Sequence, residues 1–368
     1  MIGLSPSAQA LRARRAAPDA APAQPSDVAL CYDAFLGREA DEGGLAYWTE
    51  RVAQGLDFDD LCAAFRDSEE HRQWLLTGPR PLLDLDQIDA AWTALNDPAW
   101  APAVKRAVFR LPEGFRLDLD PDGPEHRAQQ LALWSRITGR ADYDAASDED
   151  TPEIGAMDAV LRPAFYATRS SAIAGDHLMG MGRLLKLADL RAGDRALEYG
   201  AGFGQIALAF ARTGVRVDTV DVNPAFCAAV DQLAARYQVE LKAHVGAFGD
   251  NPAGQAAAYD LIYFYESFHH CLDVHAVLPK LKTLLKPGGR ILLGGEPILP
   301  TDDPITPYAW GVRMDAENVA IMRQRGWMEL GFQEPYLFDL FARAGFQGVK
   351  HPSSDSHYAT VYAFTAVD

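Results

Sequence analysis

An acidic residue and three alternating glycines form the first stretch of the chain whose residue types suggest chemistry. A short apolar run ends at Glu198, and Gly200, Gly202 and Gly204 follow before an Ala/Leu-rich helical pattern begins. The pattern predicts a strand, a tight turn and a helix, with glycine where bare backbone must reverse sharply and approach a ligand. A carboxylate at the strand end would repel a pyrophosphate and suits a nucleotide ligand that carries an ammonium group. A glycine-rich turn without a ligand is the alternative.

The spacing differs from that of the dinucleotide fingerprint, because the third glycine comes one residue early and Gln205 stands where that fingerprint has glycine. The pattern E-x-G-x-G-x-G instead resembles the first motif of the class I S-adenosylmethionine (SAM) methyltransferases. In that family the acidic residue holds the methionine end of SAM, and the glycines pass under its ribose and sulfonium. The resemblance implies SAM as the cofactor. It also implies cofactor contacts from Glu198, Gly200, Ala201, Gly202 and Gly204.

A second acidic residue follows the next predicted strand. Val215–Val220 is the next predicted strand and ends in Asp221, about 20 positions beyond the glycine turn, and a carboxylate at that spacing can accept both hydroxyls of a ribose. Pro224 can begin the helix that comes next. Capping of that helix is the other role open to Asp221. Because the glycine motif precedes it, we expect Asp221 and its neighbour Val222 to bind the cofactor.

Three further cofactor contacts rest on the resemblance. After a third predicted strand, Glu240–Val245, the family often has an acidic residue that bonds the adenine amino group, and Asp250 stands there. A solvated loop residue is the alternative. Glu266 ends the fourth predicted strand. Tyr166 precedes a helix that in the family can close over the methionine moiety, although an aromatic residue there can equally serve packing.

Two adjacent histidines are the candidate catalytic residues. Tyr259–Glu266 is a continuous apolar run, typical of a parallel strand buried on both faces, and Ser-Phe-His-His follows at the edge where ligands of open α/β sheets bind. A neutral imidazole there can take the proton from a hydroxyl that attacks the methyl group. Small-molecule methyltransferases have a histidine at the position of His270, so we expect His270 to be the base, with His269 as its substitute. Packing or helix capping by either histidine stays open, and no carboxylate at ligand spacing indicates a metal.

The remaining motifs complete one fold. Leu284–Leu293 predicts a helix end, a Pro-Gly-Gly turn and a fifth strand, a combination that the same family has and that dinucleotide dehydrogenases lack. Gly345–Ala366 contains two alternating runs around Pro352, which predicts an antiparallel hairpin. We therefore expect an α/β protein with a doubly wound, Rossmann-like, seven-stranded sheet of the class I methyltransferase type, preceded by a small all-helical domain.

Residues 299–335 interrupt this fold between the fifth strand and the next helix. The insertion is rich in proline, aromatic and charged residues, and we expect it to form a lid over the strand ends where a substrate enters. Aromatic rings in the lid can stack on a sugar or on another ring, although each Trp can equally belong to the lid's own core. The expected substrate contacts are Trp310, Arg313, Trp327 and Glu329.

The first part of the chain carries a different pattern. Residues 1–27 are rich in Ala, Pro and Ser, and we expect a disordered tail. Short amphipathic helices follow, and the pattern Tyr…Leu-Gly-Arg…Tyr-Trp…Ser-Glu within 28–72 resembles a small helical bacterial domain of unknown function, which recurs in secreted repeat proteins and polysaccharide-locus enzymes. We therefore expect a helical domain over 28–78, a helical connector or cap over 79–160 and the methyltransferase domain over 161–368.

Composition limits the classes of partner. The 368 residues carry a net charge of −17, which argues against nucleic acid as the main substrate, because phosphate contacts require clustered Lys and Arg. No apolar run is long enough to span a membrane, and the N-terminus lacks the apolar core of a signal peptide. Four scattered cysteines indicate reduced thiols, so we expect a cytoplasmic protein. The sequence leaves the oligomeric state open.

These features predict a SAM-dependent methyltransferase. The reaction that we expect is O-methylation of a sugar, a glycan-linked or another small-molecule hydroxyl, assisted by a histidine that faces the pocket. Two alternatives stay open. One is N- or C-methylation of a small molecule, and the other is a protein that binds SAM or a glycan without turnover.

Overall fold

The structure, a computed structural model, describes residues 5–16, 22–149 and 170–367. The chain divides into two compact units. The first unit is Met1–Arg116 with Arg313–Gln324, and the second is Leu117–Val312 with Arg325–Asp368. The division differs from the predicted domains, because its boundary falls within the expected connector and a piece of the expected lid belongs to the first unit.

Short helices packed on aromatic side chains build the first unit. Phe35 stacks on Trp100 with ring centroids 4.6 Å apart, and Tyr32 meets Phe65 edge to face at 4.8 Å. All four rings are buried, so together they provide an apolar core that no single short helix could form. The elements are α1 (Pro6–Ala16), α2 (Pro25–Cys31), η1 (Tyr32–Leu36), α3 (Glu42–Ala53), α4 (Phe58–Arg66), α5 (Glu69–Thr77), β1 (Leu82–Leu83), η2 (Leu85–Gln87), α6 (Ile88–Leu95), α7 (Ala101–Val104), β2 (Val108–Phe109) and most of α15 (Ala316–Arg325).

Helix α1 differs from the disordered tail predicted over 1–27. Ala8 and Leu11 of this helix are buried, and Arg14 lies 3.7 Å from the carboxylate of Asp27 in α2. The composition rich in Ala, Pro and Ser predicted a tail, but the Ala and Arg residues of α1 have high helix propensity, and burial of one apolar face stabilises the helix. The short helices predicted over 28–72 are present as α2 with η1, α3 and α4.

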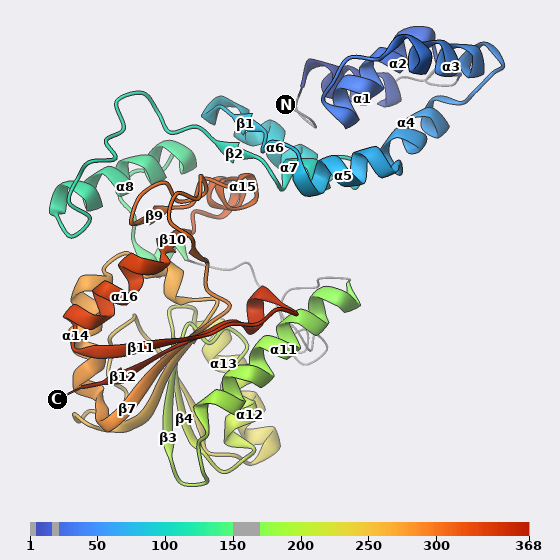
Figure 1. Cartoon of the computed structure of the whole chain (residues 1–368). Helices are drawn as coiled ribbons and strands as arrows, with labels where there is room; N and C mark the ends of the chain where they lie inside the picture. The colour runs from blue at the N-terminus through green and yellow to red at the C-terminus, as the bar shows by residue number, and fades with distance from the viewer. Residues whose placement is uncertain (1–4, 17–21, 150–169, 368) are drawn as a thin grey trace. The chain divides into compact units, whose positions relative to one another are not determined.

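The second unit contains the predicted seven-stranded sheet (Figure 1). Its strand order is β11-β12-β7-β6-β3-β4-β5. The strands from β3 to β7 pair in parallel, whereas β12 lies between β7 and β11 and is antiparallel to both. The predicted closing hairpin is therefore confirmed. The strands are β3 (Arg195–Tyr199), β4 (Arg216–Asp221), β5 (Leu241–Val245), β6 (Tyr259–Tyr265), β7 (Leu285–Gly294), β11 (Phe346–His351) and β12 (Val361–Ala366).

Helices cover both faces of this sheet, as in a doubly wound fold. On one face Leu184, Phe210 and Val230 bring three helices into a single buried cluster with the sheet. On the other, Phe341 of α16 stacks on Phe364 of β12 at 3.7 Å, and Figure 1 shows α14 and α16 opposite α11 and α12. The helices are α8 (Pro124–Thr138), α9 (Ala145–Asp148), α11 (Ser171–Ala188), α12 (Gln205–Ala211), α13 (Pro224–Tyr237), α14 (Val274–Leu284) and α16 (Glu334–Arg343).

The insertion after β7 forms a small sheet of its own. Strands β8 (Ile298–Leu299), β10 (Leu330–Gln333) and β9 (Trp310–Val312) pair in that order. Helix α8 fixes this sheet through hydrogen bonds. Gln130 accepts from the N–H of Val312 at 3.0 Å, and the indole of Trp134 donates to the carbonyl of Gly326 at 3.1 Å. The insertion within the second unit is thus tied to a helix that precedes the large sheet.

The central strands end together at one edge of the large sheet. Tyr199 of β3 is in register with Val220 of β4 and Phe264 of β6, and Tyr265 is in register with Gly294 of β7. In parallel sheets such an edge receives the loops that bind ligands. The predicted site residues follow these strands.

Candidate functional site at the carboxyl edge of the sheet

The glycine turn after β3 brings bare backbone onto the loop that follows β6. Gly200 has a φ of +66°, and a Cβ atom there would come within 2.6 Å of the Cβ of Ser267. The Gly200 N–H donates to the carbonyl of Val220 at 2.8 Å. Gly202 and Gly204 also have positive φ. Glycine is required at Gly200 because a side chain would strain the backbone and would not fit the space.

Asp221 ends β4 and is fixed by two backbone amides. Its Oδ2 accepts from the N–H of Gly202 and its Oδ1 accepts from the N–H of Asn223, each at 2.9 Å. Burial raises the pKa of Asp221, although both hydrogen bonds favour the charged form. The helix-capping role that was open to Asp221 belongs to Asn223, whose side chain accepts from the first amides of α13. The oxygens of Asp221 retain lone pairs for the hydroxyls of a ribose.

Two adjoining pockets lie at this edge of the sheet. The larger has about 770 Å³ of space including its open mouth, which is in the ordinary range for a ligand site. The smaller has about 450 Å³ on the same basis and shares with the larger the first two glycines of the turn and Glu266. The predicted cofactor residues that line one or both pockets are Glu198, Gly200, Ala201, Gly202, Asp221, Val222 and Glu266.

Glu198 supplies a buried carboxylate to the smaller pocket. The hydroxyl of Tyr263 donates to its Oε2 at 3.0 Å, yet burial outweighs this hydrogen bond and raises the pKa of Glu198 to about 8. A carboxylate that is desolvated in this way gains most from a cationic ligand. Glu266 lies between the two pockets, and His177 of α11 lies 3.2 Å from its carboxylate.

Two predicted cofactor residues, Asp250 and Gly204, do not line either pocket. Asp250 accepts from the N–H of Ala247 in its own loop at 2.8 Å, and the pocket wall there consists of Gly246, Ala247 and Phe248. This geometry favours the loop alternative for Asp250 over a contact with adenine. Gly204 precedes α12, where a Cβ would come within 2.7 Å of Val230. Tyr166 lies outside the described residues.

His269 lies between two glutamates. Its Nδ1 is 2.7 Å from Oε2 of Glu296, and its Nε2 is 3.4 Å from Oε2 of Glu329. Although burial would lower the pKa of His269, the two carboxylates raise it to about 10. Both ring nitrogens of His269 thus face carboxylates, an arrangement that stabilises the protonated ring in the metal-free protein. This geometry disfavours His269 as the substitute base.

His270 lines the larger pocket together with Asp221. Its Nδ1 lies 3.1 Å from Oε2 of Glu149, whose other oxygen accepts from the hydroxyl of Tyr143 and from the N–H of Met328, each at 2.7 Å. Burial lowers the pKa of His270, but the charge of Glu149 outweighs it and raises the pKa above the ordinary value. The predicted pocket-facing histidine is present, and a fixed carboxylate orients it.

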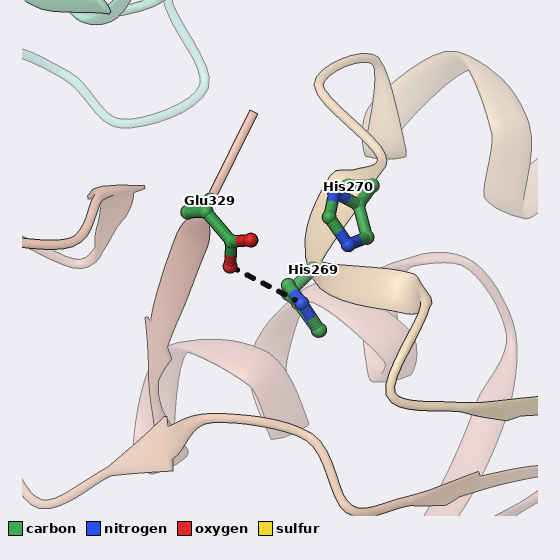
Figure 2. Close-up of side chains that lie close together, drawn as sticks. All are labelled: His269, His270 and Glu329. Atoms are coloured by element: carbon green, nitrogen blue, oxygen red, sulfur yellow. Dashed lines mark ion pairs between the residues drawn. The ribbon is translucent and has the colours of Figure 1, made fainter. Parts of the chain in front are cut away.

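A third side chain joins the two histidines. Figure 2 shows His269, His270 and Glu329 pointing toward one another, and one potential ligand atom from each lies within 4.8 Å of the others. No carboxylate lies at ligand spacing in the sequence, because Glu329 follows the histidines only after α14, β7 and most of the insertion. Folding brings the carboxylate of Glu329 to the two histidines, although it is far from them in the sequence.

The four predicted substrate residues do not lie together in one site. Trp327 lines the larger pocket, and Glu329 faces His269. Trp310 is only 1% exposed and donates from its indole to the carbonyl of Pro121, so it belongs to the core of the small sheet. Arg313 pairs with Asp315 at 3.1 Å within the first unit.

Two carboxylates of the site were missed by sequence reasoning. Glu149 lies within the expected connector over 79–160, and only the fold reveals its contact with His270. Glu296 carried a weak signal, because it follows the buried strand β7 at the edge where the other strands end. Its oxygens accept from the backbone N–H groups of Ser267 and Phe268, each at 2.9 Å.

Comparison with known families identifies two segments. Residues 197–291 match the model of a methyltransferase domain, and residues 22–74 match a domain of unknown function, DUF4214. These segments contain the glycine turn with both histidines and the short helices of the first unit, respectively. Among the helices in the described parts of the chain, none is both long and apolar enough to cross a membrane.

Curated relatives match part of the chain. The ubiquinone biosynthesis O-methyltransferase of Xanthomonas axonopodis pv. citri is 30% identical over 102 residues, which cover 28% of this chain and 43% of that protein. The 27-O-demethylrifamycin SV methyltransferase of Amycolatopsis mediterranei is 30% identical over 140 residues, which cover 37% of this chain and 48% of that protein. The chain thus spans less than half the length of either relative.

Solved structures match at low identity. The YcgJ protein of Bacillus subtilis has a TM-score of 0.41 and 22% identity, over 48% of this chain and 71% of that one. The 1,6-didemethyltoxoflavin-N1-methyltransferase of Burkholderia thailandensis, solved with its substrate and S-adenosylhomocysteine, has a TM-score of 0.38 and 17% identity, over 68% of this chain and 93% of that one.

Proposed function

Because residues 197–291 are a class I SAM-dependent methyltransferase domain, we propose that the chain transfers the methyl group of SAM to a hydroxyl of a small molecule. The observation that carries the proposal is that His270 lines the same pocket as Gly200, Gly202 and Asp221. A group able to handle a proton therefore borders the space in which the cofactor would bind. Both cited curated relatives are named as methyltransferases, and the first is named as an O-methyltransferase.

The residues at the sheet edge suit the parts of SAM. The buried carboxylate of Glu198 would hold the ammonium group, since its raised pKa reflects a site that favours a cation. The close approach of Gly200 to Ser267 leaves backbone at the place where a ligand passes. Asp221, fixed by two amides, would accept the ribose hydroxyls. SAM supplies a methyl group that is already activated, so positioning of the acceptor contributes most of the rate.

His270 is the candidate proton acceptor. Nδ1 of His270 faces the carboxylate of Glu149 at 3.1 Å, which leaves Nε2 for the hydroxyl of the acceptor. Trp327, whose ring lies 6.3 Å from that of His270, offers an aromatic surface against which a planar or sugar ring can pack. We include sugar and glycan-linked hydroxyls among the acceptors, because the first unit carries a module that resembles one found in polysaccharide-locus enzymes.

A cytoplasmic location is proposed with this function, since all four cysteines are free thiols.

A product analysis tests the proposal. The purified chain is incubated with SAM that carries an isotope-labelled methyl group and with a panel of phenols, catechols, sugars and amines, and the products are analysed by mass spectrometry. We expect label on oxygen in at least one acceptor class. Label only on nitrogen or carbon would replace the proposal with the alternative reaction, and binding of S-adenosylhomocysteine without any transfer would indicate a protein that binds SAM without turnover.

The matched variants are His270→Ala and His351→Ala. His351 ends β11, on the edge strand of the sheet, so its removal controls for the general loss of an imidazole. We expect transfer to fall in the first variant and to stay within twofold of the wild type in the second. Equal rates in both variants would contradict the role of His270.

A further inference from the structure

We propose that His269, His270 and Glu329 bind one divalent transition-metal ion beside the larger pocket. The binding itself is independent of the proposed function, whereas the chemical role of the ion rests on it. The three side chains point toward one another, as Figure 2 shows, and they come from segments far apart in the sequence. Two imidazoles and one carboxylate are a ligand set that binds catalytic metals and leaves positions open for other ligands.

The distances suit a first-row metal. One potential ligand atom from each residue lies within 4.8 Å of the others, and His269 Nε2 lies 3.4 Å from Glu329 Oε2. Two ligands at tetrahedral angles on a zinc ion, each about 2.1 Å from the metal, are separated by about 3.4 Å. The distance between His269 Nε2 and Glu329 Oε2 therefore already suits two ligands of one ion. A rotation of the His270 ring would bring in the third ligand.

Both histidines have the outer contact that metal ligands require. Nδ1 of His269 lies 2.7 Å from Glu296, and Nδ1 of His270 lies 3.1 Å from Glu149. A ligating histidine commonly donates its other N–H to a carboxylate, which fixes the tautomer and the ring orientation. In both residues this arrangement leaves Nε2 for the metal.

Burial and charge give an independent reason. The side chains of Glu149, Glu296 and Glu329 are 12%, 1% and 6% exposed, so three carboxylates share a nearly dry site with the two imidazoles. Nδ1 of His270 is buried and lacks a hydrogen bond of acceptable geometry, although Glu149 is close. A divalent cation would balance the buried negative charge, and a small shift of His270 toward it would align its outer contact.

The ligand set selects the class of metal. Imidazole nitrogen favours Zn²⁺, Fe²⁺, Co²⁺ or Ni²⁺ over Mg²⁺ and Ca²⁺, which prefer oxygen ligands. Because His270 also lines the larger pocket, an acceptor hydroxyl could occupy an open position on such an ion. With the ion bound, His270 would act as its ligand in place of accepting the proton itself. The ion would lower the pKa of that hydroxyl, so that its proton leaves to solvent and its lone pair stays on oxygen for the attack.

Cobalt provides the direct test. Full-length protein without a purification tag is dialysed against a chelator and titrated with Co²⁺, while visible absorption is recorded and calorimetry gives the stoichiometry. We expect one ion per chain with the intense absorption of a four- or five-coordinate site. In Glu329→Gln we expect at least tenfold weaker binding, and in the surface variant Glu317→Gln we expect binding like that of the wild type.

Circular dichroism and titration with S-adenosylhomocysteine show whether each variant is folded. If Glu329→Gln does not fold, His270→Gln serves in its place. No cobalt spectrum in the folded wild type, or an equal spectrum in the variants, would overturn the metal site. Stoichiometric metal binding without methyl transfer would refute the proposed function and leave the metal site standing. Full methyl transfer by metal-free protein would support the proposed function and refute the chemical role of the ion.

Discussion

Nδ1 of His269 lies 2.7 Å from Oε2 of Glu296, and the same carboxylate accepts the backbone N–H groups that precede the histidine. Glu296 follows β7 and His269 follows β6, so this contact joins the loops after two neighbouring strands. Burial raises the pKa of Glu296, but His269 and the backbone amides outweigh it and hold the pKa below its ordinary value. The loop that carries both histidines is thereby fixed at the edge of the sheet.

Replacement of Glu296 tests this contact. Glu296→Gln leaves a buried histidine without its main charge partner and weakens the hydrogen bonds to the loop, so we expect a loss of about 3 kcal/mol in the free energy of unfolding. Urea denaturation measures it. Glu317→Gln removes an exposed ion pair with Lys105 and should change the free energy of unfolding by less than about 1 kcal/mol. Equal effects in both variants would contradict the structural role of Glu296.

The raised pKa of Glu198 predicts that cofactor affinity depends on pH. Burial raises this pKa from 4.5 to about 8 in the free protein, and an ammonium group binds only to the ionised form. The affinity for S-adenosylhomocysteine should therefore rise by up to about tenfold per pH unit from pH 6 toward 8 and then level off.

The stability of the free protein should follow the opposite direction. A carboxyl group whose pKa is higher in the folded than in the unfolded state contributes stability that is fully present below 4.5 and is lost as the pH rises toward 8. Calorimetry of binding and denaturation, each across this pH range, measures both effects. Glu198→Gln should abolish the pH dependence of binding; a variant that keeps it would show that another group is responsible.

A pair of glycine variants tests the turn after β3. Gly200→Ala places a Cβ within 2.6 Å of Ser267 at a φ of +66°, so we expect roughly tenfold or greater loss of S-adenosylhomocysteine affinity together with lower stability. Gly182→Ala is the control, because Gly182 lies inside α11 with open space around it. That substitution should stabilise the protein by about 0.5–1 kcal/mol. Wild-type affinity in Gly200→Ala would exclude the turn from the cofactor site.

Two acidic residues near the pocket should differ in their effect on binding. Asp221→Ala removes a carboxylate that lines the pocket and bonds the glycine turn, and we expect about 10- to 100-fold weaker binding of S-adenosylhomocysteine. Asp250→Ala removes a bond within a loop, and we expect less than about fivefold. Calorimetric titration compares them. The reverse order would restore the predicted adenine contact of Asp250.

Two tryptophans of the insertion give the last comparison. Trp310→Ala removes a side chain that is 1% exposed, and a loss of about 3–5 kcal/mol in the free energy of unfolding is expected. Trp327→Ala should raise the KM for the acceptor and leave the stability nearly unchanged, since its ring borders the pocket. Denaturation and steady-state kinetics separate the two effects. A raised KM in a stable Trp310→Ala variant would contradict the core position of that ring.

The sequence predicted the large sheet, and most of the predicted cofactor residues line the two pockets. Strands β3, β4 and β6 combine apolar or β-branched residues with glycine, proline or acidic residues at or just beyond their ends, and such local signals place these strands within a residue or two. The glycine turn and Asp221 were identified for the same reason, because the motif and its spacing are local. The prediction of a disordered tail is wrong for Pro6–Ala16, because the Ala and Arg residues there also favour the helix α1.

The histidine cluster shows what local patterns could not predict. His269 is adjacent to His270 in the sequence, but Glu149, Glu296 and Glu329 come from three separate segments that only the folded chain brings together. The short distances from His269 to Glu296 and Glu329 show that His269 is ion-paired. His270 lines the larger pocket. The different positions of Trp310 and Trp327 could not be predicted for a related reason, since exposure within the insertion depends on how the small sheet packs on α8.

The rate of methyl transfer by His270→Ala tests the central claim most directly. The acceptor identified for the wild type is used at saturating SAM, and binding of S-adenosylhomocysteine is measured on the same preparation. We predict that transfer to oxygen falls by about 10²- to 10⁴-fold while the affinity for S-adenosylhomocysteine stays within about threefold. An unchanged rate of transfer to oxygen would contradict the account, because the acceptor would then lose its proton without His270.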